Sequence, residues 1–232
     1  MTTTTESAPG LTDAQASRLI PGAAIAVVGG PLLLAIANAV VNFGPVWKDV
    51  DDTADLLAAV AAHPTATEAD MLLGLASVAL LPPAAWAIML MLRRRSPLLA
   101  AVGGWLTAVG YAFALVLTTE SAVPLQVAKA GIDPAPLAEA IDGYTPLPMM
   151  IVYAVFGVGA LFGCVFLGVA ALRQGGLVPR WAGWALIASA PVRIAGLAAG
   201  IAAGPPLASL LILAGFIGIL ISFRRSGAPA TA

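Results

Sequence analysis

Charged side chains are scarce in this sequence, and their scarcity excludes most soluble folds. Asp, Glu, Lys and Arg make up 10% of the 232 residues, whereas a typical soluble domain carries about 25%. A chain with so little charge cannot cover a globular surface in water. The 11 basic residues balance 12 acidic ones and are too scattered to form a phosphate-binding stripe, so no nucleic-acid partner is expected.

Cysteine and histidine are almost absent, and so are the motifs that hold metals or phosphates. Cys164, the single cysteine, lies in an apolar run and can form no internal disulfide. His63, the single histidine, stands beside Pro64 and is expected to be exposed at a helix end. The sequence contains no H-E-x-x-H, no C-x-x-C and no Walker loop, so it indicates neither a metal site nor a cofactor.

Long apolar runs dominate what remains. Hydrophobic residues make up 60% of the chain, and the mean hydropathy is +0.96. A helix needs about 20 apolar residues to cross the hydrocarbon core. Six segments have about that length: 20–41, 71–92, 97–119, 147–172, 181–203 and 206–223. The sequence therefore predicts an all-α polytopic membrane bundle, with one six-helix domain over 20–223 between disordered cytoplasmic tails at 1–19 and 224–232.

Basic residues are distributed unevenly about these six segments. Eight of them fall on one side of the predicted membrane: Arg18, Arg93, Arg94, Arg95, Arg173, Arg180, Arg224 and Arg225. The loops of the opposite side contain only Lys48 and Lys129. Because basic residues are retained in the cytoplasm, this asymmetry places both termini and the two short arginine-rich turns there.

The two long loops of the outer side are acidic, and each contains an amphipathic pattern. In DDTADLLAAVAAHP, Asp51 or Asp52 can cap the start of a helix, and in DPAPLAEAIDGYTP the cap is Asp133. The apolar residues expected to face inward are Leu56, Leu57, Val60, Leu137 and Ile141. The sequence thus predicts two outer amphipathic helices, of the kind that lie flat in the membrane interface.

Three pairs of features recur about 80 residues apart. They are Asp52 and Asp133, Arg93 and Arg173, and the dipeptides Gly104-Trp105 and Gly183-Trp184. Each copy would contain an outer helix, an inward span, a basic turn and an outward span. The spacing predicts a parallel tandem repeat, although any helical hairpin with a basic turn gives a similar pattern.

Arg193 is the charged residue that lies inside an expected span. At 1.5 Å per residue it lies roughly 18 Å from the cytoplasmic end of that span, in the outer half of the membrane. The residues that share its helix face are small: Ser189, Gly196 and Gly200. Small residues favour close helix packing in membranes, and Gly159-x-x-x-Gly163 offers a counterpart in the preceding span. We therefore expect Arg193 to point into the bundle.

The partner of Arg193 is left open between a carboxylate, a backbone carbonyl and a ligand. Glu120 is the first choice of carboxylate, because it continues directly from a span. The other outer-side carboxylates considered are Glu68, Asp70 and Asp142. Pro82-Pro83 could instead free carbonyls near Val78 and Ala79 in mid-membrane. The candidate ligand-binding residues are Arg193, Glu120, Ser189, Tyr111 and Tyr153.

Two stretches resemble a known kind of protein. LLPPAAWAIMLMLRRRSPLLAAVGGWLTAVGYAFA and ALRQGGLVPRWAGWALIASAP, with the composition rich in Ala, Gly and Pro, resemble small six-span membrane proteins common in actinobacteria. That group is generally classed as domains of unknown function. The resemblance covers roughly residues 20–222 and rests on composition and basic-turn hairpins. It implies a bacterial inner-membrane location, but no activity and no site residues.

Three classes of function stay open. The first is the binding or passage of a lipid, an amphiphile or a small anion in a cavity beneath the outer helices, with Arg193 as its charged floor. The second is an accessory subunit that packs against a partner. The third is a membrane-embedded enzyme that uses outer carboxylates on an isoprenoid or lipid. We favour the first, because enzymes need converging titratable groups and proton-coupled transporters usually need acidic residues within spans.

Overall fold

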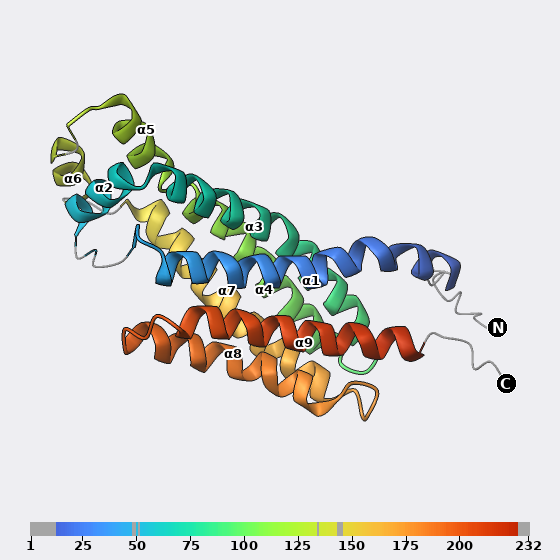
Figure 1. Cartoon of the computed structure of the whole chain (residues 1–232). Coiled ribbons are helices and arrows are strands. Elements are labelled where there is room, and N and C mark those ends of the chain that lie inside the picture. Colours follow the sequence, from blue (N-terminus) through green and yellow to red (C-terminus); the bar gives the residue numbers. More distant parts are fainter. Residues whose placement is uncertain (1–12, 48–49, 51, 134, 143–145, 227–232) are drawn as a thin grey trace, which may run out of the picture.

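Helices make up all the regular secondary structure in the described part of the chain. The computed structural model describes residues 13–47, 50, 52–133, 135–142 and 146–226. Its helices (Figure 1) are α1 (Asp13–Phe43), α2 (Thr53–Ala62), α3 (Pro64–Leu92), α4 (Pro97–Thr118), α5 (Ala122–Ala130), α6 (Ala135–Asp142), α7 (Leu147–Leu172), α8 (Arg180–Ala198) and α9 (Gly204–Ser226). The predicted all-α class is confirmed.

Six of the described helices are long and apolar enough to cross a membrane, so the chain is a multi-pass membrane protein. The predicted bounds agree with α4 and α7 to within one residue. Helix α3 begins earlier than expected, at Pro64, because proline is favoured in the first helical turn and only His63 separates α3 from α2. Helix α1 also begins early, at Asp13, within the segment 1–19 that the sequence predicts to be a tail.

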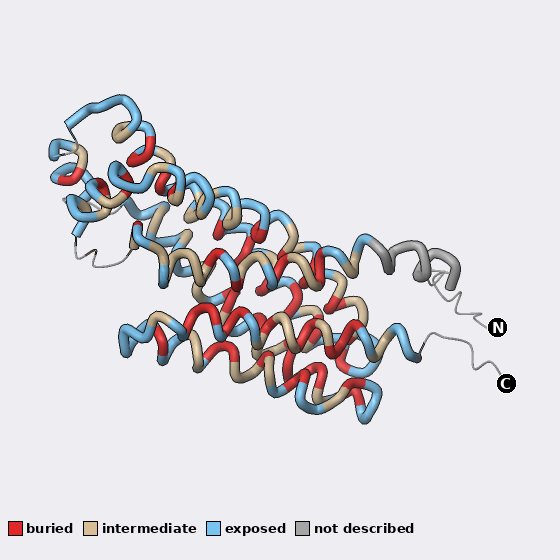
Figure 2. Tube along the Cα trace, in the orientation of Figure 1, coloured by how far each residue is buried: buried red, intermediate tan, exposed pale blue. Residues whose placement is uncertain are grey.

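The six spanning helices form a closed ring. Each packs against its neighbour in the order α1, α3, α4, α7, α8 and α9, and α9 packs back against α1. The two arginine-rich turns lie at one end of the ring, here called the basic end, and the short helices α2, α5 and α6 form a cap at the other, the cap end (Figure 1). Buried residues concentrate in the middle and in the basic-end half (Figure 2).

Glycines bring α4 and α7 into backbone contact. A Cβ atom added to Gly110 would lie 2.8 Å from the Cα of Gly159, and one added to Gly103 would lie 3.0 Å from the carbonyl oxygen of Gly163. The expectation that Gly159 and Gly163 receive the small face of α8 is therefore wrong. The small face of α8 meets α9 instead, where a Cβ on Gly196 would lie 2.5 Å from the Cα of Gly204.

Gln174 joins the two turns of the basic end. Its fully buried side chain donates from Nε2 to the carbonyl oxygens of Leu92, at 2.8 Å, and Ala170, at 3.1 Å. In return, Arg95 donates from Nη1 to the backbone carbonyl oxygen of Gln174 at 2.8 Å. The carbonyl of Leu92, at the end of α3, is thus satisfied from across the ring, and that of Ala170, near the end of α7, is satisfied by the turn that follows it.

The cap confirms part of the prediction for the outer loops. Asp52 caps α2, with its Oδ1 accepting from the backbone N–H of Asp55 at 2.8 Å, and both Leu57 and Val60 are buried. Asp51 lies outside the described residues. The cap holds three helices where two are expected, since α5 also forms and ends at Gly131 in the left-handed conformation (φ 63°).

Helix α6 departs further from expectation. At the start of α6, the Oδ1 of Asp133 accepts a hydrogen bond from the backbone N–H of Ala135 at 3.0 Å, as expected of an N-cap residue. Ile141 is 44% exposed rather than inward-facing, and the buried residue of the helix is Ala138. The tandem repeat stays a prediction.

Candidate functional site

Polar residues form a layer across the cap-end half of the ring. Arg193 lies five residues before the end of α8, Asn38 five residues before the end of α1, and Ser209 five residues after the start of α9. At 1.5 Å per residue, all three lie about 7.5 Å below the cap ends of their helices. Three adjacent helices therefore present polar groups at one depth.

The Ser209 hydroxyl is the centre of this layer. It accepts from Arg193 Nη2 at 3.0 Å and from Asn38 Nδ2 at 2.9 Å, and it donates to the carbonyl oxygen of Pro205 at 3.0 Å. A hydroxyl has one donor and two acceptor positions, so Ser209 is saturated. Its bonds hold Arg193 in the ring and leave no further acceptor position on Ser209.

The side chain of Tyr111, on α4, extends toward the same polar layer. Its side chain is 1% exposed, its ring packs edge-on against Phe156 with 5.9 Å between centroids, and its hydroxyl makes no hydrogen bond of normal geometry. That hydroxyl interacts electrostatically with the Arg193 guanidinium, as does the buried Cys164 thiol. Arg193 therefore extends from α8 toward groups of α4, α7 and α9, into the bundle.

Among the described carboxylates, none lies within ion-pair distance of Arg193. The expected pair with Glu120 is wrong, because Glu120 accepts from the Tyr153 hydroxyl at 2.8 and 3.0 Å. The ring order explains this pairing. Helix α7 stands between α4 and α8, so a side chain at the end of α4 meets Tyr153 of α7 before it can reach α8.

Backbone carbonyls of α3 are not the acceptors either. Pro82 and Pro83 lie inside α3, which continues as one helix from Pro64 to Leu92. The acceptor of Arg193 is the Ser209 hydroxyl. The carbonyl alternative raised by the sequence is therefore not realised.

The five predicted site residues fall into two groups. Arg193 and Tyr111 come together in the polar layer, and Ser189, one turn deeper on α8, interacts with Cys164 and donates to the carbonyl oxygen of Leu186 at 2.7 Å. Glu120 and Tyr153 form a separate pair nearer the cap. Sequence reasoning missed Asn38 and Ser209. Their signal was weak but present, since each is a polar residue at a similar depth in an apolar span.

No protein-family model, no curated protein and no solved structure matches this chain.

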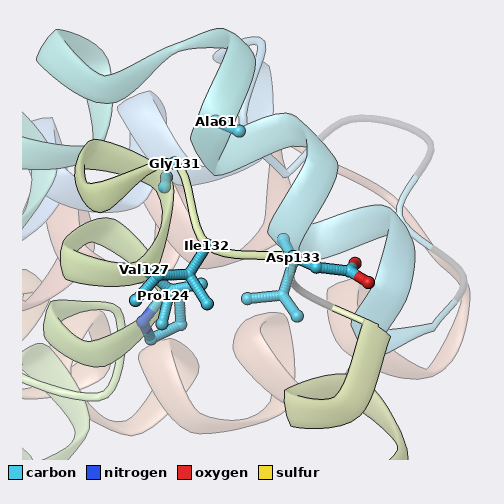
Figure 3. Close-up of a pocket in the computed structure, with 8 residues that line it drawn as sticks. Ala61, Pro124, Val127, Gly131, Ile132 and Asp133 are labelled. Atoms are coloured by element: carbon cyan, nitrogen blue, oxygen red, sulfur yellow. The ribbon is translucent and has the colours of Figure 1, made fainter.

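Two cavities lie in the cap, and Arg193 lines neither. One is a groove of about 400 Å³ between α2 and α5 (Figure 3), with apolar walls and one carboxylate. Its lining residues are Leu57, Ala61, Pro124, Val127, Ala128, Gly131, Ile132 and Asp133. Of the spanning helices, the cap contacts only α3. The expected cavity beneath the outer helices, with Arg193 as its floor, is not among these two.

The second cavity, of about 410 Å³, contains two carboxylates that already have structural partners. Asp52 caps α2, and Asp142 accepts a hydrogen bond from the Thr53 hydroxyl, which ties the end of α6 to the start of α2. No group of three or more His, Cys, Asp or Glu side chains that could hold a metal ion occurs among the residues searched. These carboxylates therefore serve the packing of the cap.

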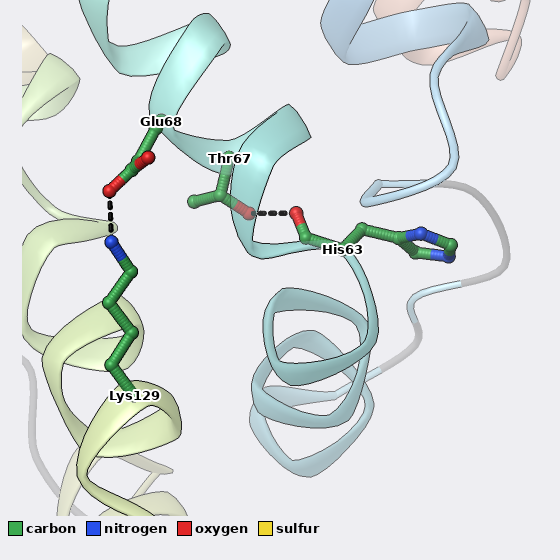
Figure 4. Close-up of polar contacts among 4 residues, drawn as sticks. All are labelled: His63, Thr67, Glu68 and Lys129. Atoms are coloured by element: carbon green, nitrogen blue, oxygen red, sulfur yellow. Dashed lines mark hydrogen bonds and ion pairs between the residues drawn. The ribbon is translucent and has the colours of Figure 1, made fainter.

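An exposed ion pair joins α5 to α3 in the cap (Figure 4). Lys129 and Glu68 form it, and their side chains are 53% and 47% exposed. His63, also exposed, contributes its backbone carbonyl oxygen, which accepts from the Thr67 hydroxyl at 3.1 Å. Both charges of the ion pair keep much of their hydration, so the pair adds little stability.

We expect Lys129→Gln to lower the free energy of unfolding by no more than about 0.5 kcal/mol, because exposed ion pairs are screened by water and salt. Unfolding in mixed micelles at low and at high salt measures this. Glu68→Gln should give the same small change. A loss above about 2 kcal/mol would show that the pair fixes the cap onto the ring.

Proposed function

We propose that the protein binds a lipid, an amphiphile or a small anion at the polar layer around Arg193. One observation carries this proposal: a half-buried guanidinium in an apolar bundle that has no carboxylate partner among the described residues. An arginine at the centre of a membrane helix costs about 2.5–3.5 kcal/mol on insertion scales. An anionic ligand would offset that cost, whereas a single hydrogen bond to a neutral hydroxyl leaves the charge uncompensated.

The depth of the layer supports a ligand from the membrane. Arg193 lies about 7.5 Å below the cap end of α8, between the cap-end surface of the hydrocarbon core and its middle, where a lipid of that leaflet can reach it. The arginine-rich basic end favours a cytoplasmic location for both termini. We therefore place the cap and the Arg193 layer at the outer leaflet. A bacterial inner membrane is the location that the family resemblance implies.

Substitution of Arg193 by leucine tests the proposal. Membranes containing the wild type or Arg193→Leu are solubilised in neutral detergent, and the small molecules that co-purify are extracted and identified by mass spectrometry. We expect the variant to lose about nine tenths of an anionic component, because removing one charge-assisted contact costs roughly 1.4 kcal/mol or more, a factor of ten.

Arg180→Leu is the matched control, since Arg180 is an exposed arginine at the basic end of the same helix. It should retain the wild-type complement of small molecules. An unchanged complement in Arg193→Leu would refute the binding function. A polypeptide that co-purifies with both proteins, with no small molecule in either, would favour the accessory-subunit class.

A further inference from the structure

The donors around Arg193 outnumber the acceptors that the bundle provides. A guanidinium has five N–H donors, and the acceptor of Arg193 is the saturated hydroxyl of Ser209. Tyr111 adds a buried hydroxyl that makes no hydrogen bond of normal geometry and interacts with the same guanidinium. Donors without acceptors are costly inside an apolar bundle, so a group that offers two acceptor atoms would complete this place.

The net charge of the polar layer limits the charge that a bound group can carry. Arg193 carries one positive charge, and the side chains that interact with it or with its acceptor are uncharged: Asn38, Tyr111, Cys164 and Ser209. One negative charge neutralises the layer, whereas a second would remain uncompensated in a medium of low dielectric constant. An oxyanion such as a phosphodiester or a carboxylate carries one charge, and its two oxygens match the fork of a guanidinium better than a single spherical halide does.

The cap-end half of α7 offers an apolar surface beside the layer. None of the residues 147–158 is buried, whereas the buried residues of α7 begin at Gly159. The exposed side chains there include Ile151 and Val158, and α8 exposes Ile194 and Leu197 near its cap end. Helices α7 and α8 touch closely in the basic-end half, where a Cβ on Gly168 would lie 2.7 Å from the carbonyl oxygen of Gly183.

We propose that the ligand is an amphiphile with a singly charged oxyanion head group, held by Arg193 and Tyr111, with its hydrocarbon chain along the exposed cap-end segments of α7 and α8. This inference rests on the proposed function and narrows it. A free oxyanion shares the head-group chemistry but would gain nothing from the apolar segments. The hydrocarbon chain adds buried apolar area to the two polar contacts.

Titration of lipids onto the detergent-solubilised full-length protein, read by native mass spectrometry, tests the inference. The probes are phosphatidylglycerol, which has one net negative charge, zwitterionic phosphatidylcholine, and free inorganic phosphate as a competitor. We expect the wild type to bind phosphatidylglycerol about tenfold more tightly than phosphatidylcholine. Millimolar phosphate should fail to displace it, because the free ion lacks the hydrocarbon chain.

Tyr111→Phe isolates the second contact. It removes one hydroxyl and keeps the ring that packs on Phe156, so the fold is retained. We expect about tenfold weaker binding of phosphatidylglycerol, because a hydrogen bond to a charged group is lost. Thr118→Val is the control, since it also removes one hydroxyl from α4 but Thr118 Oγ1 donates to the carbonyl oxygen of Leu115 on its own helix, and its affinity should equal that of the wild type.

The outcomes separate this inference from the proposed function. If Tyr111→Phe binds as the wild type does while Arg193→Leu has lost its co-purifying anion, the two-point contact is overturned and the proposed function stands. If phosphate displaces the lipid at equal concentration, the ligand is a small oxyanion and the amphiphile is overturned. If Arg193→Leu retains its bound molecules, the proposed function itself fails.

Discussion

Replacing Gly159 with alanine is expected to lower the free energy of unfolding by about 3 kcal/mol, at the upper end of typical overpacking costs. The added methyl group would lie 2.5 Å from the carbonyl oxygen of Leu106 and 2.6 Å from the Cα of Gly110. Both are backbone atoms of α4, so no side-chain rotation can make room. The two helices would have to separate along their whole contact, which includes Gly103 and Gly163.

Gly157, on the same helix, provides the matched control. A Cβ at Gly157 meets no atom within 4 Å. Gly157→Ala should therefore be neutral or stabilising by up to about 1 kcal/mol, the difference in helix propensity between the two residues. Reversible unfolding in mixed detergent micelles, followed by circular dichroism, gives both values. Equal stabilities of the two variants would show that α4 and α7 do not meet at Gly159.

Replacing Gln174 with methionine should cost about 2 kcal/mol, the second-largest effect that we expect on stability. Methionine is similar in length but cannot donate, so the carbonyl oxygen of Leu92 would lose its donor from across the ring. The side chain is 0% exposed, so water can replace the bond only if the two turns separate. The same unfolding experiment measures the loss.

Gln126→Met is the control for this substitution, because Gln126 is an exposed glutamine of α5 in the cap. It should change the free energy of unfolding by less than about 0.5 kcal/mol. Arg95→Met should have an intermediate effect, since it removes the bond from Arg95 to the Gln174 carbonyl oxygen and leaves the side-chain bonds in place. A neutral Gln174→Met would mean that the turns are held by apolar packing alone.

Local sequence features predicted the elements of the fold well. Apolar length located the six spans, because crossing a hydrocarbon layer requires a minimum run of apolar residues whatever lies beside it. The N-cap of α2 was also predictable, since Asp52 bonds the backbone N–H of Asp55, which is three residues away. Helix α5 was missed, because AVPLQVAKA is only 9 residues long and follows α4 after only a short turn.

Contacts between distant residues could not be predicted in the same way. Glu120 was the expected partner of Arg193 because it lies on the outer side and continues directly from a span, but position along the membrane does not say which helices are neighbours. The ring places α7 between them, so Glu120 bonds Tyr153 and Arg193 bonds Ser209. Gln174 gave no signal at all, since a glutamine after a helix is ordinary until the facing carbonyl is known.

The sequence by itself determined that the chain crosses a membrane six times, that its arginines gather at one end, and that one arginine points into the bundle from a small-residue face. These follow from hydropathy, charge and the period of a helix, which are properties of the chain alone. Only the tertiary structure decided the ring order, the α4–α7 backbone contact and the neutral surroundings of Arg193. In an apolar solvent the spanning helices associate through packing and through hydrogen bonds between side chains that are far apart in the sequence. Whether two such faces fit each other is decided only when the helices meet in the folded bundle.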